Sequence, residues 1–459
     1  MSDSDIITVI LAAGEGTRMK SSKPKVMFSA LNKPLLGWVK DAVFEAVNGE
    51  IIAVVGKGVD EVKAYFKDDI KYAHQSERLG SGHAVMCASS LFEGKGGYIL
   101  ILAGDSPLIT PKTIKELIDK TRNENYDACL LSAAFEDATG YGRIVKDKNG
   151  LVEKIVEHKD ATEEQLNIKE INASVYCVKE ELLSQCLKQI RPVNAQGEYY
   201  LTDIVELLYK QGKKVASMQV KDTAECMGVN TRVQLAQVSE VLRMRVLEKL
   251  MLNGVTIIDP KNTYIDADVK IGTDSIIYPN VTLEGNTVIG EGTILYPGSR
   301  IADSKIGSNT KIQNSVILES LVGDNTIVGP FAYLRPESNI GNNCRVGDFV
   351  EVKNAYIADG AKVSHLTYVG DGEIGEKTNV GCGVVFVNYD GSKKCRTHVG
   401  KNCFIGCNVN LIAPVSIGDG SYIAAGSTVT SDVPENSLCI ARSRQTIKQD
   451  WDGIVKKEK

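Results

Sequence analysis

The second half of the chain carries aliphatic residues at a fixed spacing of six. From Ile265 to Ile301 every sixth residue is Ile or Leu, and a later run with the same period extends from Val399 to Val429. Gly, Ala or Asp commonly follows the aliphatic residue. Such a repeat is typical of a parallel β-helix, in which six residues form one short strand and the aliphatic side chain points inward. This period constrains the fold more than any other feature of the sequence.

The coils of this β-helix are expected to be triangular, with three strands each. The hexapeptide form resembles the left-handed β-helix of many acyltransferases, although the general preference for right-handed crossovers would predict the opposite hand. One segment, Val387–His398, breaks the period with Asn388-Tyr-Asp-Gly391 and three basic residues. We expect it to loop out of the prism, and loops on rigid scaffolds often carry function.

The first half of the chain alternates short apolar segments with helical patterns. The predicted strands include Ile6–Leu11, Ile51–Val55, Tyr98–Ala103 and Ala128–Ala134, and the predicted helices include Leu35–Val43, Ala84–Phe92 and Pro111–Thr121. Strands that alternate with helices predict a mostly parallel sheet covered on both faces. This is a Rossmann-like α/β domain, and ligands of such domains bind beyond the carboxyl ends of the strands.

A single helix is predicted to link the two halves. Its apolar stripe consists of Val233, Ala236, Val241, Met244, Leu247 and Met251. Gly254 is a plausible stop for this helix. At 459 residues the chain is too long for one ordinary core. We therefore predict an α/β domain over residues 1–229, a linker helix over 230–252, and a β-helix domain with a C-terminal tail over 253–459.

Charge and cysteine content narrow the class of protein. The net charge of −5 gives no global attraction for nucleic acid or an anionic membrane, so neither is predicted as a partner. Eleven cysteines are scattered without CxxC pairs, which favours reduced thiols over a disulfide framework. The acidic start Met1–Asp5 and the lack of an 18-residue apolar run argue against a signal peptide and a membrane span. We predict a cytoplasmic protein.

A glycine-rich segment, Leu11-Ala-Ala-Gly-Glu-Gly-Thr-Arg18, directly follows the first predicted strand. Glycines there let backbone N–H groups approach phosphate oxygens, and Arg18 and Lys25 add positive charge. The spacing matches neither the Walker A motif nor the dinucleotide fingerprint, so ATPase and dehydrogenase activities are disfavoured. The alternative is a tight turn with a surface arginine.

This segment resembles the signature of the sugar-1-phosphate nucleotidyltransferases. Further matching segments follow in order: Gln75 with Leu79-Gly-Ser-Gly-His-Ala84, Gly104-Asp105, Gly140-Tyr-Gly-Arg143, Glu157-His-Lys-Asp160, Glu170-Ile-Asn172 and Gly228-Val-Asn230. The resemblance implies that nucleotide and sugar bind at Leu11, Ala12, Ala13, Gly14, Lys25, Gln75, Gly80, Ser81, Gly140, Glu157, Asn172 and Asn230. It also implies that Asp105 and Asn230 hold Mg²⁺, an ion that prefers oxygen ligands. Arg18, Lys25 and the metal would offset charge as a sugar phosphate attacks the α-phosphorus of UTP.

The β-helix carries four segments that depart from its repeat: Leu334-Arg335-Pro336, Glu351-Val-Lys353, His365-Leu-Thr-Tyr368 and Asn388-Tyr-Asp-Gly391. Their separations of roughly one coil would stack basic, aromatic and amide groups on one side. Arg335 and Lys353 suit a sugar phosphate. Histidine titrates near physiological pH, so His365 can remove a proton from a sugar ammonium as the amine attacks a thioester. A purely structural His365 is the alternative.

Over nearly its whole length the chain resembles the family of bifunctional bacterial enzymes that combine N-acetylglucosamine-1-phosphate uridylyltransferase with glucosamine-1-phosphate acetyltransferase. The resemblance implies that His365 is the catalytic base, and that glucosamine 1-phosphate binds at Arg335, Lys353, Tyr368 and Asn379. Asn388 and Tyr389 would complete that site from the long loop and border acetyl-CoA. Acetyl-CoA would also contact Cys382, Cys407, Ala425 and Arg442. A homotrimer, acetyl transfer before uridylyl transfer, and a product that feeds peptidoglycan are further implications.

Three residues depart from the family pattern. The chain has Gly381-Cys382-Gly383 where Gly-Ala-Gly is expected. Cys407 stands where a serine is usual, and Ala103 where an aromatic residue is frequent. We interpret these changes as tuning. Two alternatives remain: a nucleotidyltransferase whose β-helix serves only assembly or allosteric control, and a regulatory subunit without activity. Both sets of polar residues are present in this one chain, with Arg18 in one set and His365 in the other, and this favours the bifunctional enzyme over either alternative.

Overall fold

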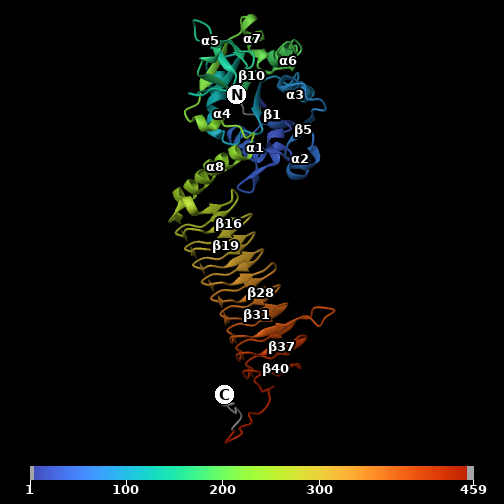
Figure 1. The fold of residues 1–459 in the computed structure, drawn as a ribbon, viewed down its shortest axis with the longest axis vertical. Coiled ribbons are helices and arrows are strands. Elements are labelled where there is room, and N and C mark those ends of the chain that lie inside the picture. Colours follow the sequence, from blue (N-terminus) through green and yellow to red (C-terminus); the bar gives the residue numbers. More distant parts are fainter. Residues whose placement is uncertain (1–4, 452–459) are drawn as a thin grey trace, which may run out of the picture. The chain divides into compact units, whose positions relative to one another are not determined.

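The computed structural model describes residues 5–451, and its internal contacts divide the chain into two units, Met1–Leu242 and Arg243–Lys459. The acidic start and the basic end of the tail, residues 1–4 and 452–459, lie outside the described residues. Within residues 5–451, no helix is long and apolar enough to cross a bilayer. The two units are described separately (Figure 1).

A twisted sheet forms the centre of the first unit. Its strand order is β11-β7-β10-β6-β1-β4-β5, with the bounds β1 Ile6–Ala12, β4 Glu50–Val55, β5 Lys71–His74, β6 Tyr98–Ala103, β7 Ala128–Ala134, β10 Glu170–Lys179 and β11 Val215–Gln219. Only β10 on this path runs antiparallel to its neighbours. A hairpin of β8 (Arg143–Lys146) and β9 (Val152–Val156) pairs with β10. The prediction of a mostly parallel sheet is confirmed.

Helices cover both faces of this sheet. Their bounds are α1 Leu35–Ala46, α2 Val59–Phe66, α3 Ser81–Ala88, α4 Pro111–Asn123, α5 Glu163–Leu166, α6 Glu180–Leu187 and α7 Asp203–Lys210. One apolar cluster joins α1 and α4 to the sheet through residues such as Val39 and Leu117. A second joins α3, α6 and α7 to its other face through residues such as Val85, Leu183 and Ile204.

The helix predicted over Ala84–Phe92 has different bounds in the structure. It begins three residues earlier, at Ser81, and its α-helical part ends at Ala88, followed by a 3₁₀ turn over Ser89–Leu91. Its start is set by tertiary contacts, since Leu201 N donates to Ser81 Oγ (3.0 Å). Apolar periodicity carries no information about such a contact, and this explains the error.

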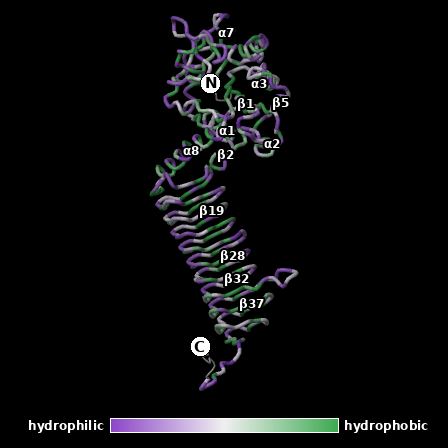
Figure 2. The backbone as a smooth tube through the Cα atoms, viewed as in Figure 1, coloured by the Kyte–Doolittle hydropathy of each residue, from purple (hydrophilic) through white to green (hydrophobic). Residues whose placement is uncertain are grey.

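The second unit is a left-handed parallel β-helix, as predicted. Three sheets run along it, headed by β12 (Thr256–Ile257), β13 (Tyr264–Ile265) and β14 (Lys270–Ile271), and all their strand pairs are parallel. Each coil adds one short strand to each sheet. The predicted six-residue lattice is buried in one continuous core, except that Ile271, in the first strand of its sheet, is only partly buried. Apolar and polar residues alternate around each coil (Figure 2).

A ladder of small polar side chains ties successive coils together. The hydroxyls of Thr293, Thr310 and Thr326 each donate to a carbonyl oxygen of the next coil, and the oxygen–oxygen distance is 2.8 Å in every case. Cys344 and Cys403 occupy equivalent buried positions, and their thiols donate to the carbonyls of Ala358 and Gly418. These two cysteines are therefore structural.

The predicted loop leaves the stack of coils between β34 (Val385–Val387) and β35 (Thr397–Val399). Figure 1 shows it projecting from the side of the β-helix in orange. An isolated bridge between Tyr389 and Lys394 closes it, and the Tyr389 hydroxyl donates to Gly391 O (2.7 Å).

The linking helix forms as α8, Arg232–Leu252, but its predicted apolar stripe is wrong in part. Val233 is 69% exposed and Met244 36% exposed, whereas Val238, Leu242 and Leu247 are buried. Val238 and Leu242 belong to an apolar cluster of the first unit, and Leu247 belongs to the core of the β-helix. Because α8 contributes to two cores, its buried residues do not follow one stripe.

Candidate active sites

The glycine-rich segment begins at the carboxyl end of β1. Leu11 and Ala12 are the last residues of that strand, and Ala13 and Gly14 follow it. Gly16 adopts φ 61°, and a Cβ there would lie 2.7 Å from the Cβ of Lys25. Glycine at this position therefore lets the Lys25 side chain pass directly over the loop.

Four polar residues that are far apart in sequence meet beside this loop. Asn230 Oδ1 accepts hydrogen bonds from Arg18 Nη2 (2.9 Å) and Lys25 Nζ (3.1 Å). The Lys25 ammonium also forms an ion pair with Asp105 Oδ2. Asp105 lies two residues beyond β6, and its carbonyl accepts from Val229 N (2.9 Å), which brings Asn230 next to it.

The oxygens of Asp105 and Asn230 converge on one cation, the ammonium of Lys25. The pair therefore has the chemistry and the direction to hold Mg²⁺, which prefers oxygen ligands. Within residues 5–451 no group of three or more His, Cys, Asp or Glu could hold a metal alone. Water and substrate phosphates would have to complete the shell, as is usual for this ion.

A cavity of about 310 Å³ opens next to this cluster. Its lining includes Leu11, Ala13, Gly14, Lys25, Gln75, Arg78, Gly80, Ser81, Ala103, Asp105 and Glu198. Gln75 is buried, and its Nε2 donates to Gly80 O (3.2 Å) and faces His83 Nδ1 (3.1 Å). Gly80 has φ 112°, and a Cβ there would lie 2.5 Å from Tyr199 O, so only glycine fits. Sequence reasoning missed Arg78 and Glu198 on this wall.

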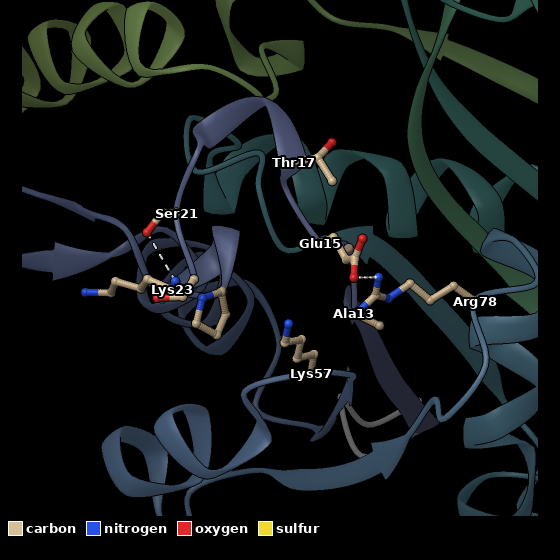
Figure 3. Close-up of a pocket in the computed structure, with 10 residues that line it drawn as sticks. Ala13, Glu15, Thr17, Ser21, Lys23, Lys57 and Arg78 are labelled. Atoms are coloured by element: carbon tan, nitrogen blue, oxygen red, sulfur yellow. Dashed lines mark hydrogen bonds and ion pairs between the residues drawn. The ribbon is translucent and has the colours of Figure 1, made fainter.

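A second cavity of about 240 Å³ shares Ala13, Gly14 and Arg78 with the first. Figure 3 shows the ion pair of Glu15 and Arg78 at one side of it and Lys23 at the other. Lys57 adds a further positive charge. Lys57 was missed, although its place just beyond β4, at the carboxyl edge of the sheet, is a signal that could have found it. The basic lining suits phosphate groups.

Gly140, Glu157 and Asn172 do not line either cavity, but Glu157 and Asn172 both lie beside Gly142, two residues after Gly140. Asn172 N donates to Gly142 O (2.9 Å), and a Cβ at Gly142 would lie 3.4 Å from the Glu157 carboxylate. Burial raises the pKa of Glu157. Burial raises the pKa of the neighbouring Tyr141, and the charges of Cys226 and Asp105 add to the effect.

Asp203, beside Glu157, provides a test of pH-dependent stability. Burial, helped by the charges of Glu206, Glu157 and Asp160, raises the pKa of Asp203 to about 6. Folding therefore loses stability as the pH rises from about 4, the usual pKa of an aspartate, to about 6, and the loss is complete above that value. We expect Asp203→Asn to stabilise the unit by about 1–2 kcal/mol at about pH 7.5, and to have no stabilising effect near pH 4.

Helix unfolding followed by far-ultraviolet circular dichroism measures this effect, because every α-helix among residues 5–451 precedes residue 253. Asp119→Asn, an exposed position on α4, is the matched control. A gain of equal size at both pH values would contradict the electrostatic explanation.

His365 ends β30 (Lys362–His365), in the middle of the β-helix. It pairs in register with Asp348 of β27 (Arg345–Asp348), and its Nδ1 lies 2.8 Å from Asp348 Oδ1. On the other side, Val363 pairs with Val380 of β33 (Asn379–Val380), so Cys382 stands next above His365 in the same column.

The residues predicted to contact acetyl-CoA continue this column. Val380, Ile405 and Ile423 are register partners in three successive coils. The residue two positions after each of them is Cys382, Cys407 and Ala425, respectively. A Cβ at Gly381 would lie 2.7 Å from Cys407 N, and a Cβ at Gly406 would lie 2.5 Å from Ala425 N. The coils are thus closely stacked here and present a strip of small side chains. Arg442 Nη1 donates to Ala425 O (2.8 Å) at its end.

The adjoining sheet carries the predicted sugar-phosphate residues. Arg335 follows β25 (Tyr333–Leu334), Lys353 ends β28 (Glu351–Lys353), and Tyr368 begins β31 (Tyr368–Gly370). Arg335 Nη1 donates to Glu351 Oε1 (2.8 Å). Asn379 begins β33, on the same sheet as His365.

The base of the long loop is anchored by hydrogen bonds to two coils. Asp371 accepts from Asn354 Nδ2 (2.6 Å) and from Asn388 Nδ2 (2.5 Å), and Asn388 Nδ2 lies 3.5 Å from Tyr368 Oη. Further along the loop, the Lys353 ammonium lowers the pKa of Lys394, so two positive charges lie close together. Sequence reasoning missed Asp371 and Lys394, because their positions depend on how the loop folds back.

Two families of known proteins match the chain. The family described as "MobA-like NTP transferase domain" matches residues 8–199, and "Bacterial transferase hexapeptide (six repeats)" matches residues 319–354 and 396–431. The first match contains the glycine-rich segment and Asp105, and the second contains Arg335 and Lys353.

Similar proteins cover almost the full length of the chain. The "Bifunctional protein GlmU" of Acetivibrio thermocellus is 51% identical over 99% of both chains. The protein of the same name from Clostridium botulinum is 52% identical over 98% of this chain and 99% of its own. Among solved structures, a UDP-glucose pyrophosphorylase complexed with UDP-glucose has a TM-score of 0.43 at 18% identity, and covers 52% of this chain and 98% of its own.

Proposed function

The chain belongs to the family of bifunctional GlmU proteins, and from this premise we propose which of its residues carry out each of the two reactions. The enzyme transfers an acetyl group from acetyl-CoA to glucosamine 1-phosphate, then a uridylyl group from UTP to N-acetylglucosamine 1-phosphate, releasing pyrophosphate. The product is UDP-N-acetylglucosamine. The observation that carries the assignment is the presence of two separate polar clusters, one around Asp105 and one around His365.

Uridylyl transfer is assigned to the first cluster. The phosphate of the sugar attacks the α-phosphorus of UTP in line, and the bond to the pyrophosphate oxygen breaks. Arg18 and Lys25 neutralise charge that develops on the phosphates. Asp105 and Asn230 would hold Mg²⁺, which when bound supplies further positive charge. Gln75 and Gly80 would hold the base, and Gly140, Glu157 and Asn172 the sugar.

The basic cavity beside Gly14 supports this assignment, because it offers room for the pyrophosphate part of UTP. Lys23, Lys57 and Arg78 surround it with positive charge. Phosphate groups bind well where backbone N–H groups and cationic side chains converge.

Acetyl transfer is assigned to the second cluster. His365 removes a proton from the ammonium of glucosamine 1-phosphate, and the amine attacks the thioester carbonyl. A C–N bond forms and the C–S bond breaks, the attacking nitrogen loses its second proton to solvent, and the imidazolium returns its proton to the departing CoA sulfur. The strip from Cys382 to Ala425 would contact acetyl-CoA, closed by Arg442 and bordered by the loop residues Asn388 and Tyr389.

The proposed binding of the sugar phosphate by Lys353 can be tested directly. We expect Lys353→Met to raise the KM for glucosamine 1-phosphate about 10- to 100-fold, because a charge-assisted hydrogen bond contributes about 1.5–3 kcal/mol. The kcat should change far less. Lys305→Met, on the third sheet of the β-helix, is the control. A loss confined to kcat would contradict the phosphate role.

We propose that the chain assembles as a homotrimer whose acetyl-transfer sites lie between subunits. An apolar ridge of Phe331, Phe349 and Leu366 supports this assembly. The three residues lie at the same corner of three successive coils, and the side chain of each is more than half exposed. The two phenylalanine rings stack with centroids 5.4 Å apart. A contiguous exposed apolar patch of this kind marks an interaction surface.

A cytoplasmic location and a role in peptidoglycan synthesis complete the proposal. The eleven cysteines are all free, which fits a reducing compartment. UDP-N-acetylglucosamine is a building block for cell-envelope polymers.

One enzyme preparation assayed in two ways tests the proposal. Acceptor-dependent thiol release from acetyl-CoA and magnesium-dependent release of pyrophosphate should both occur. Pyrophosphate release alone would indicate a β-helix that serves assembly or control, and neither activity would indicate a regulatory subunit. Gel filtration with light scattering tests the trimer.

A further inference from the structure

A carboxylate lies against the imidazole of His365, and the two belong to successive coils. The backbone places them together, because Asp348 and His365 are register partners in the parallel pairing of β27 with β30. Their side chains meet at 2.8 Å between Asp348 Oδ1 and His365 Nδ1. The contact is therefore fixed by the stacking of the coils as well as by the side chains.

This contact determines which nitrogen of His365 is available as a base. A carboxylate accepts hydrogen bonds, so the proton of the neutral imidazole belongs on Nδ1, where it is donated to Asp348. The Nε2 atom is then left with a lone pair. The other tautomer would set a lone pair against the carboxylate and leave Nε2 unable to accept a proton.

The carboxylate keeps its charge at neutral pH. The hydrogen bond from His365 holds the pKa of Asp348 below its usual range, with Arg345 on the same strand acting in the same direction. The neighbouring coil brings the thiol of Cys382 and the neutral Asn379 to this sheet. Among these groups, Asp348 is the negative charge positioned to stabilise the imidazolium.

We propose that Asp348 is a positioning residue for acetyl transfer: it fixes the tautomer and the orientation of His365, and it stabilises the imidazolium that forms when Nε2 takes a proton from the sugar ammonium. This inference rests on the proposed role of His365 as the base. The same division of labour between a carboxylate, an imidazole and a reacting group operates in catalytic triads.

Stability alone does not explain the pair. Both side chains are substantially exposed, His365 at 55% and Asp348 at 38%, and ion pairs at such positions contribute little to folding. The fold does not require it either, because the coils on both sides are joined by backbone hydrogen bonds, including Leu366 N to Asp348 O (2.9 Å).

The chain contains a matched control. His398 of β35 pairs in register with Glu373 of β32 (Gly372–Ile374), and His398 Nδ1 lies 3.2 Å from Glu373 Oε2. This second carboxylate–imidazole pair also joins successive coils, but it lies on the third sheet. Glu373→Gln therefore removes a similar exposed charge away from the column of His365.

The experiment compares wild type with Asp348→Asn, Asp348→Glu, His365→Ala, the double variant Asp348→Asn/His365→Ala, and Glu373→Gln. Thiol release gives kcat and KM for acetyl transfer, and the elution volume of each variant in gel filtration reports whether its β-helix is folded and assembled as in wild type. For Asp348→Asn we expect kcat to fall about 10- to 100-fold, with each KM changing by less than about threefold. Asp348→Glu should recover part of the loss, and Glu373→Gln should match wild type.

The double variant distinguishes positioning from a structural role. If Asp348 acts through His365, its replacement should have no further effect on the residual rate of His365→Ala. Equal losses in both backgrounds would overturn the inference, as would an Asp348→Asn kcat within about twofold of wild type. A change in KM alone would overturn it too, and would make Asp348 a substrate-binding residue. Full acetyl transfer by His365→Ala would instead refute the proposed base.

Discussion

Replacing His365 by alanine is expected to lower acetyl transfer about 10²- to 10⁴-fold, while uridylyl transfer stays within about twofold of wild type. The loss follows from removing the only proposed proton acceptor on the column that leads to Cys382. Uridylyl transfer should survive, because Asp105 and Lys25 belong to the other unit. Thiol release and pyrophosphate release on the same preparation measure the two effects.

His398→Ala is the control for this experiment, since it removes an exposed histidine from another sheet of the β-helix. It should leave both activities unchanged. A folded His365→Ala enzyme that loses both activities together would contradict the assignment of the two reactions to separate units.

Asp105→Ala is expected to produce the opposite pattern. Uridylyl transfer should fall about 10²- to 10³-fold or more, because the change removes one of two protein oxygens proposed for Mg²⁺ and the ion-pair partner of Lys25. Acetyl transfer should be unaffected. Pyrophosphate release measured across a magnesium titration separates a lost metal site from a lost fold, since a weakened site responds to added metal.

Asp119→Ala, on the exposed face of α4, is the matched loss of an aspartate in the same unit. It should behave as wild type at every magnesium concentration. Wild-type activity of Asp105→Ala at ordinary magnesium levels would refute the metal assignment.

Much of the fold was predictable because its signals are local. Strands β6 and β7 have the bounds that their apolar runs predicted, and the six-residue lattice identified the β-helix. The stripe on α8 was wrong because Val233 and Met244 lie on a helix that contributes to two cores, and a helical period cannot tell which core a residue joins.

The candidate sites were predictable where a residue belongs to a motif, as for Lys25 and His365. Residues that act through a neighbour in space were missed. Asp348 reaches His365 only through the register of two coils, and Arg78 reaches Glu15 only because their loops meet between two cavities. The spacing of these residues along the sequence predicts neither contact, because both depend on how distant parts of the chain pack together.

The hydroxyl ladder makes each coil depend on its two neighbours alone, so the β-helix should lose structure from its ends, as linear repeat proteins do. Fraying from the C-terminal strand β41 (Leu438–Cys439) would reach Ala425 before it reaches His365. Brief opening of the last coils would then release the end of the acetyl-CoA strip while the proton acceptor stayed in place. On this view the end of the acetyl-CoA strip and the proton acceptor would differ in local stability along one stack of coils.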